Sequence, residues 1–446
     1  MKDFTPAYVP VGVPTFHLES AKDLFERSVK LLRGTGPSFI VPDDMLLSVD
    51  SMCAYIDGLD PDLIVFQDLT FANAAYMSEV VERFDCPLLL WTLREPVIDG
   101  TRLRLNSLTG AYSAANTFRQ FGKEPFEYMY GGPEEEKVRH TAETVIRAAK
   151  VKHAMRSLRG CAIGHTPEGF GFGRALDLDL LQTFGVHQEA IEARELIEKA
   201  KGYTDEEITE YLEDAMKKTV GLENTPEKNR YDFARLYKAY DTFVKEHGIG
   251  MIASRCWPDF FTSFGTPVCT VLGMLNDMGV AAACEADMYG ALSMWIGMQL
   301  SHKAVFFGDP VSLDEKKNTI TFWHCGTAAC SLARKDTGAV IGEHCNRHIG
   351  PTLEFGCEQS EHATVFRIGR NPDGTFRFFI VSGKALDEPK QFFGTSVVVE
   401  TKGNSETIVH ESVKSGFEPH YVVIFDDVAD ELEVLANMFK TEAIRY

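Results

Sequence analysis

The chain has 446 residues, of which 44% are hydrophobic, 25% charged and 11% aromatic. This balance is typical of globular domains and excludes the disordered and fibrous classes. The net charge of -20 disfavours nucleic acids and anionic membrane surfaces as partners. The longest apolar stretches, such as Pro87–Leu93, are far shorter than the roughly 20 residues of a membrane span. The N-terminus has no apolar signal region, so we expect a cytoplasmic protein of two or three domains with reduced cysteines.

Residues 1–156 alternate between helical and strand-like patterns. Ala21–Leu32 and Phe71–Phe84 have helical periodicity, and Asp62–Gln67 and Pro87–Thr92 are short apolar runs typical of buried strands. Such alternation predicts a parallel sheet covered by helices on both faces. We expect an α/β domain of Rossmann or flavodoxin type.

Residues 157–302 repeat this alternation. Strands are predicted at Arg159–Ile163, Gly250–Ser254 and Ala281–Cys284, with long helices at Tyr231–Gly248 and Tyr289–Leu300. We expect a second α/β domain of the same type. Its loop 164–174 is rich in glycine but is not GxGxxG, so a tight turn is favoured over a phosphate cradle, although its amides could approach a sugar.

Residues 303–446 are predicted to form a mostly β domain, barrel-like or a sandwich, that ends with the helix Ala429–Phe439. The segments between turn residues are strand-like. They are Ala304–Gly308, Thr319–Trp323, Ala363–Arg370, Phe376–Leu386, Thr395–Glu400 and Thr407–Val413.

Two acidic residues follow apolar strand-like runs. Glu285 follows Ala281–Cys284, and Asp309 follows Ala304–Gly308. The carboxyl edge of a parallel sheet is where open α/β folds bind ligands, so the pair is a candidate functional site. Each acid alone is more simply explained as a helix N-cap, and for the pair the two interpretations stay open.

Histidines near these acids are candidate metal ligands. His324 follows the run Thr319–Trp323. Imidazole together with carboxylates suits Mn²⁺ and similar ions. A histidine in this position is also often a hydrogen-bonded core residue. Cys325 is a softer ligand that fits poorly beside carboxylates. His344 and His348 give only a weak zinc signal.

At these residues the chain resembles the L-fucose/L-arabinose isomerase family. Glu285-Ala-Asp-Met-Tyr-Gly-Ala-Leu followed by Gly308-Asp309 is similar to the pattern in which a Glu and an Asp bind Mn²⁺. The segment from Pro419-His420 is similar to the family's closing segment, whose His is the third ligand. The chain is shorter than typical L-fucose isomerases, mainly in its C-terminal third.

The resemblance implies further roles. His324 would be a fourth ligand or a hydrogen-bond partner of the substrate, and Gln67, Trp91 and Arg255 would contact the sugar. The cofactor would be Mn²⁺ or another divalent cation such as Co²⁺ or Mg²⁺. The protein would be a homo-oligomer, hexamer or trimer, whose pockets are completed by a neighbouring subunit.

The implied reaction is aldose–ketose isomerisation of an open-chain sugar: a 6-deoxyhexose, a pentose or a modified hexose. Glu285 and Asp309 would both bind the metal and move a proton between C1 and C2 through an enediolate. Two alternatives stay open at this point: an epimerase or enediolate-forming lyase on the same metal site, and a non-catalytic sugar-binding protein.

Overall fold

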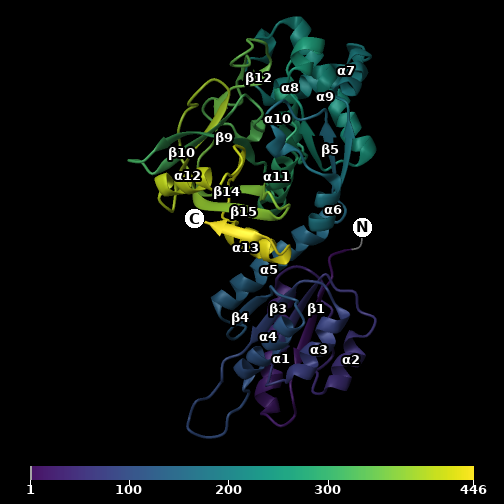
Figure 1. Cartoon of the computed structure of the whole chain (residues 1–446), viewed down its shortest axis with the longest axis vertical. Coiled ribbons are helices and arrows are strands. Elements are labelled where there is room, and N and C mark those ends of the chain that lie inside the picture. Colours follow the sequence, from purple (N-terminus) through teal and green to yellow (C-terminus); the bar gives the residue numbers. More distant parts are fainter. Residues whose placement is uncertain (1–2) are drawn as a thin grey trace. The chain divides into compact units, whose positions relative to one another are not determined.

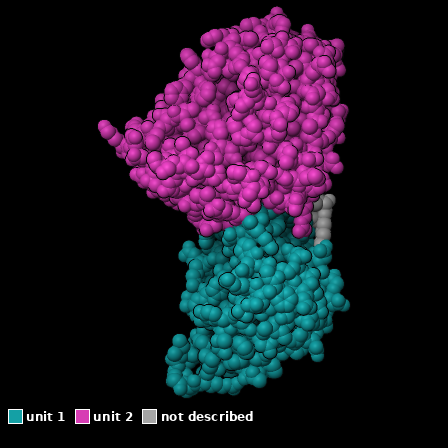
Figure 2. All heavy atoms as spheres, viewed as in Figure 1, with its two compact units in different colours: residues 1–154, 434–440 teal, residues 155–433, 441–446 magenta. Residues whose placement is uncertain are grey.

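The computed structural model describes residues 3–446 and divides the chain into two compact units (Figure 2). One unit extends to Ala154 and includes Val434–Lys440, and the other comprises Met155–Glu433 and Thr441–Tyr446. All ten cysteines are free, as predicted. No helix among residues 3–446 combines the length and apolar character that a membrane crossing requires.

The first unit contains a sheet of four parallel strands (Figure 1). Its order is β1 (Pro6–Val11), β2 (Leu63–Asp68), β3 (Leu88–Thr92) and β4 (Glu127–Tyr130). One face packs Val9, Phe66 and Leu90 against α2 (Val49–Ile56), α3 (Ala74–Arg83) and α4 (Ser107–Gln120). On the other face Tyr8 stacks on Phe25 of α1 (Leu18–Gly34), and α5 (Glu136–Met155) follows the last strand.

The sequence prediction missed β1. Pro6 and Pro10 each remove a backbone N–H donor, which argues against a central strand, but β1 is the edge strand of its sheet, and its outer side makes only isolated bridges to Ile40 and Leu46.

The second unit contains another sheet of four parallel strands. Its order is β6 (His187–Ile191), β5 (Arg159–Ile163), β7 (Met251–Ser254) and β8 (Ala281–Cys284). The connecting helices are α6 (Asp177–Phe184), α7 (Ala193–Lys201), α8 (Thr209–Lys218), α9 (Glu227–His247), α10 (Cys269–Asp277) and α11 (Met288–Ser301). Nearly every residue of α11 is buried, because this helix contacts β7 and β8 as well as the C-terminal strands β14 and β17.

The C-terminal strands form a large antiparallel sheet that closes on itself. Six strands pair in the order β16, β10, β9, β17, β14, β15, and β15 pairs again with β16. They are β9 (Phe306–Asp314), β10 (Thr319–His324), β14 (Ser360–Arg370), β15 (Phe376–Ala385), β16 (Thr395–Thr401) and β17 (Tyr421–Ile424). Two short strands, β13 (Phe355–Gly356) and β18 (Glu442–Arg445), extend it in parallel, and β11 (Ile341–Gly342) pairs with β12 (Thr352–Leu353) nearby. The mixed α/β architecture with a mostly β C-terminal sheet is confirmed.

One predicted strand, Thr407–Val413, is wrong. This segment lies in helix α12 (Ser405–Lys414), and the Asn404 side chain caps it by accepting a hydrogen bond from the Thr407 N–H at 2.8 Å. The β-branched run Thr407-Ile408-Val409 had suggested a strand. The terminal helix α13 (Ala429–Met438) is present, but β18 follows it.

The substitution Gly383→Ala is expected to lower the free energy of unfolding by about 1–3 kcal/mol. A Cβ at this position would clash with the Glu400 carbonyl oxygen, where β15 pairs with β16. Denaturant unfolding followed by tryptophan fluorescence measures the effect. Gly202→Ala in the same unit is the control, since its Cβ would meet nothing closer than 3.4 Å. Equal midpoints for the two variants would contradict the close strand approach.

Candidate active site

Glu285 leaves the carboxyl edge of the parallel sheet directly after β8. Its backbone and that of Ala286 are left-handed, with φ of 58° and 57°, which costs on the order of 1–3 kcal/mol per residue. The turn is held by hydrogen bonds from the Ala286 N–H to the Ser254 carbonyl (3.1 Å) and from the Asp287 N–H to the Cys284 carbonyl (3.2 Å). The side chain of Glu285 is therefore aimed by a fixed, strained turn.

The register of the barrel strands brings three more polar residues together. Tyr421 pairs with Gly308, so His420 and Asp309 occupy the next positions along β17 and β9. Asp309 pairs on its other side with Trp323, next to His324 at the end of β10. The pairing of three adjacent strands thus brings together residues that are far apart in the sequence.

The expected position of Asp309 at the carboxyl edge of a parallel strand is wrong. Asp309 lies inside β9, which continues to Asp314 and pairs antiparallel with β10 and β17. Pro310 pairs with Phe322 and Ser312 with Thr321, which leaves Val311 as an extra, bulged residue. A bulge turns neighbouring side chains out of the regular pleat, and here it lies two residues from Asp309.

The side chains of Glu285, Asp309 and His420 are close neighbours. His420 Nε2 lies 3.0 Å from Glu285 Oε2 and 3.5 Å from Asp309 Oδ1. His420 is only 1% exposed, whereas Glu285 and Asp309 keep 18% and 32% of their side-chain surface, so the carboxylates are the accessible part of the cluster. Glu285, His324 and His420 also offer ligand atoms within 4.8 Å of one another, a group that could hold a metal ion.

Asp287 is a site residue to which the sequence analysis gave no role. Its fully buried carboxylate accepts hydrogen bonds from His420 Nδ1 (2.8 Å) and from the Gly290 N–H at the start of α11 (2.8 Å). It also pairs with Arg367 of β14, whose nitrogens lie 2.5 and 3.1 Å away. In the sequence it stands two residues after Glu285, where an apolar run ends and a predicted helix follows.

The charges around Asp287 determine how His420 is oriented. Burial alone would raise the pKa of Asp287, but Arg367 and His420 hold the pKa below its ordinary value. The ionised carboxylate can only accept, so His420 Nδ1 must donate, and Nε2 is directed at Glu285 and Asp309. A buried carboxylate behind a histidine is the usual support of a metal-binding imidazole.

The cluster also perturbs its other members. Burial raises the pKa of Asp309, and the nearby Glu285 carboxylate adds to this effect. Burial opposes protonation of both His420 and His324. Hydrogen bonds to Asp287 and Glu285 nevertheless raise the pKa of His420, and Cys325, followed by Asp309 and Glu285, raises the pKa of His324 to about 10. The site therefore concentrates negative charge and favours cations.

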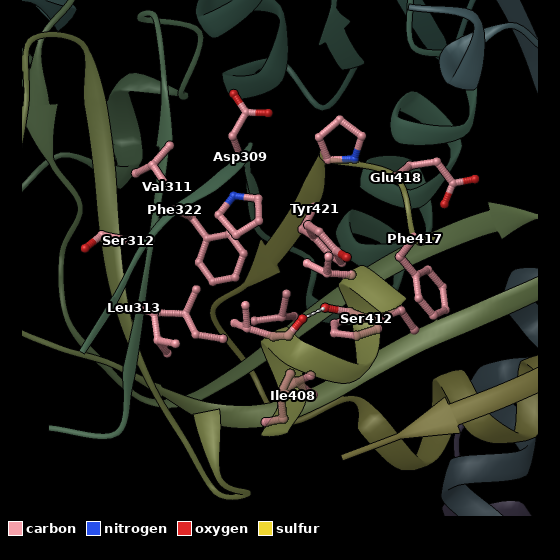
Figure 3. A pocket seen from close by; sticks show the side chains of 18 residues that line it. Asp309, Val311, Ser312, Leu313, Phe322, Ile408, Ser412, Phe417, Glu418 and Tyr421 are labelled. Atoms are coloured by element: carbon pink, nitrogen blue, oxygen red, sulfur yellow. Dashed lines mark hydrogen bonds between the residues drawn. The ribbon is translucent and has the colours of Figure 1, made fainter. Parts of the chain in front are cut away.

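Two cavities open beside Asp309. The smaller, about 240 Å³, lies over the cluster, and its lining comprises Cys256, Trp257, Glu285, Asp309, Trp323, His324, Cys325, His344, Asn346 and Arg347. The larger, about 710 Å³, has mostly apolar walls, and Figure 3 shows Asp309 at one end of it and Ile408 at the other. The smaller cavity is the one that suits a sugar, because the hydrogen-bonding side chains of Glu285, Asp309 and His324 converge on it.

The glycine-rich loop forms a wall near the cluster. The ring of Phe172 lies edge-on to His420 with centroids 5.2 Å apart, and Phe170 lies 6.5 Å from the same ring. A Cβ on Gly173 would lie 2.8 Å from the Asp287 Cα, so glycine permits this close approach. The loop is a tight turn that shields His420.

The three residues expected to contact sugar lie in different surroundings. Arg255 follows β7, and its Nε lies 2.9 Å from Asp259 Oδ2. Gln67 and Trp91 belong to the other compact unit, where both are fully buried. Gln67 hydrogen-bonds Tyr8 and Ser28, and Trp91 Nε1 donates to the Gly131 carbonyl at 3.0 Å. Their contact with sugar stays a prediction.

Thiols lie behind His324. Two sets of soft donors could hold a metal ion: Cys269, Cys325 and His344, and Cys284, His324 and Cys325. Hydrogen bonds with Cys269 and Cys284 hold the pKa of Cys325 well below its ordinary value. Glu285 and His420 belong to neither thiol set, although His324 is shared with the second, so the carboxylate cluster is a harder donor set that adjoins the thiols.

Replacing Asp287→Asn is expected to destabilise the fold by about 3–5 kcal/mol, because it leaves the buried Arg367 unpaired. Because folding lowers the pKa of Asp287, its ionised carboxylate stabilises the fold. This stabilisation is complete above about pH 3.9 and is lost as the pH falls through the lowered pKa. The Asp287→Asn variant should lack this part of the pH dependence of the free energy of unfolding.

The control for this variant is Asp179→Asn, because Asp179 pairs at 2.9 Å with Arg370 of the same strand but both side chains are partly exposed. Its cost should be about 1 kcal/mol or less. Denaturant unfolding between pH 2 and pH 7 measures both variants, and equal losses would argue against a central role for Asp287.

Comparison with known proteins identifies the family. The chain is 60% identical over 446 residues, with 100% of both chains covered, to sulfoquinovose isomerase from Clostridium sp. (strain MSTE9). It is 34% identical over 454 residues, again with 100% of both covered, to sulfoquinovose isomerase from Priestia aryabhattai, and 34% identical over 443 residues, 99% of each, to that from Alkalicoccus urumqiensis. No family model matches. The chain belongs to the sulfoquinovose isomerase family and is an aldose–ketose isomerase.

Proposed function

We propose that this chain isomerises sulfoquinovose, an aldohexose with a sulfonate on C6, to the corresponding ketose with the help of a divalent cation. The observation that carries the proposal is the convergence of His420 Nε2 on the carboxylates of Glu285 and Asp309, at 3.0 and 3.5 Å. The full-length relatives named for this sugar support the choice of substrate. The isomerase family sets aside the non-catalytic sugar-binding alternative.

The donor set fits a divalent cation. Two adjacent ligands that each lie about 2.1 Å from one octahedral ion are about 3 Å apart, close to the spacing of His420 from the two carboxylates. Carboxylates and one or two imidazoles suit Mn²⁺, with Co²⁺ or Mg²⁺ as alternatives. Glu285, Asp309 and His420 would hold the ion. His324 would be a fourth ligand or a hydrogen-bond donor to the sugar.

When bound, the cation would polarise the sugar carbonyl and offset negative charge that develops on O1 and O2. Glu285 and Asp309 would take the proton from C2 of the open-chain aldose and return it to C1, through an enediolate, while the hydroxyl proton of O2 passes to O1. Phe172 and the buried ring of His420 would keep water from the reacting carbons on that side. Asp287 would hold His420 in place without touching the sugar.

We also propose that the chain shares this site with the L-fucose/L-arabinose isomerases and that each parallel sheet belongs to a Rossmann or flavodoxin-like domain. The boundaries 1–156, 157–302 and 303–446, the trimeric or hexameric assembly, the shared pocket and the cytoplasmic location stay predictions.

Glu285→Gln and Asp309→Asn are each expected to lower kcat by at least about 100-fold, because each removes a proton carrier. The assay strips the metal, restores Mn²⁺ and measures ketose formation from sulfoquinovose, L-fucose and L-arabinose. Glu361→Gln, an exposed carboxylate on β14, is the control. Near-normal turnover in either site variant would remove the assignment, and an aldose product instead of a ketose would indicate an epimerase.

His420→Ala is expected to reduce the metal bound per chain, because it removes the buried ligand of the cluster. Elemental analysis of protein reconstituted with Mn²⁺ measures this loss. His324→Ala separates its two roles: lower metal content indicates a ligand, and full metal with a raised KM indicates a sugar contact. Unchanged metal content in His420→Ala would exclude His420 as a ligand.

A further inference from the structure

A positive side chain shares the smaller cavity with the acidic cluster. Arg347 belongs to the segment Glu343–Gly350 between β11 and β12, and it lines the same cavity as Glu285 and Asp309. In the sequence this segment shows only a weak zinc signal, from His344 and His348. A guanidinium beside two carboxylates in a chain of net charge -20 calls for an explanation.

The guanidinium of Arg347 has no acidic partner among residues 3–446. It stacks instead on two aromatic rings, with Cζ 5.3 Å from the centre of Trp257 and 4.8 Å from the centre of Phe261. These rings hold the plane of the guanidinium while leaving its N–H groups free to donate. By contrast Arg255, the arginine predicted to contact sugar, is paired with Asp259 at 2.9 Å.

The segment that carries Arg347 is wound around the buried side chain of His344. The Asn346 N–H donates to His344 Nδ1 at 3.2 Å, and the N–H groups of Arg347 and His348 donate to the His344 carbonyl at 3.1 and 2.8 Å. The His344 ring packs edge-on against Phe261, 5.0 Å between centroids. Arg347 is thus held in place before any ligand arrives, which lowers the entropy cost of binding.

The charge of the cavity explains why such an arginine is needed. Glu285 and Asp309 are required at the C1–C2 end of the sugar, and they repel any anionic substrate. A sulfonate on C6 lies at the far end of the same molecule. A fork of N–H donors matches its oxygens in both geometry and charge, as it does for carboxylate and phosphate.

We propose that Arg347, with Asn346 beside it, binds the C6 sulfonate and selects sulfonated sugars over neutral ones. The proposal rests on the proposed function and names the residue that recognises the charged end of the substrate. Arg347 takes no part in proton transfer.

The test compares Arg347→Gln and Arg347→Lys with the wild-type enzyme loaded with Mn²⁺. Calorimetry measures the affinity for sulfoquinovose, for its neutral counterpart 6-deoxyglucose and for glucose 6-phosphate, and a kinetic assay measures kcat and KM. Arg347→Gln should weaken sulfoquinovose binding and raise its KM about 100-fold while leaving 6-deoxyglucose binding unchanged. Arg347→Lys keeps the charge but loses the paired N–H donors of the guanidinium, so it should weaken sulfoquinovose binding about 10-fold.

Arg194→Gln, an exposed arginine on α7, is the control and should change neither sugar's affinity. Equal losses for the charged and the neutral sugar would reveal a merely structural role and overturn the proposal, as would unchanged sulfoquinovose affinity. If the wild-type enzyme binds glucose 6-phosphate more tightly than sulfoquinovose, the group that Arg347 recognises is a phosphate, and the proposal is also overturned. If the wild type binds sulfoquinovose through Arg347 but forms no ketose, the proposed function fails and the sulfonate site stands.

Discussion

The buried carboxylate of Asp287 is the group on which the geometry of the site depends. It caps α11, pairs with Arg367 of β14 and accepts a hydrogen bond from His420, so the parallel sheet, the long helix and the barrel meet at one charged point. A buried charge is costly unless every lone pair is satisfied, and these contacts satisfy both oxygens. The strained turn at Glu285 and Ala286 persists because Asp287, the next residue, is held so firmly.

This arrangement separates two tasks between two parts of the site. Carboxylates and imidazole from the sheet edge and the barrel strands make a small region that attracts a cation. The segment Glu343–Gly350, outside those strands, contributes an arginine whose charge has the opposite sign. With the proposed sulfonate site, such a divided cavity would suit a substrate with a neutral reacting end and an anionic tail, the kind of sugar for which the full-length relatives are named.

Much of the fold could be predicted because its central strands are short apolar runs with clear boundaries. Arg159–Ile163 and Ala281–Cys284 were predicted with the bounds that the structure has. The errors arose where local pattern and tertiary context disagree: two prolines concealed the edge strand β1, and a β-branched run resembled a strand in α12. The closure of the barrel rests on the pairing of β15 with β16, which no local pattern encodes.

The site was predictable to a lesser degree. The end of β8 pointed to Glu285, but His420 came mainly from family resemblance, and its nearness to Asp309 depends on the register of β9 and β17. Asp287 lies beside Glu285 with no sequence feature that distinguishes its role, and Arg347 lies in a segment without regular pattern. Both depend on partners distant in sequence, such as Arg367 and Trp257.

The most direct measurement is anomalous X-ray diffraction from crystals of the full chain grown with Mn²⁺. We predict one strong manganese peak within coordination distance of Glu285, Asp309 and His420. A peak among Cys269, Cys325 and His344 instead, or no peak beside the carboxylates at saturating Mn²⁺, would contradict the metal-dependent isomerase site.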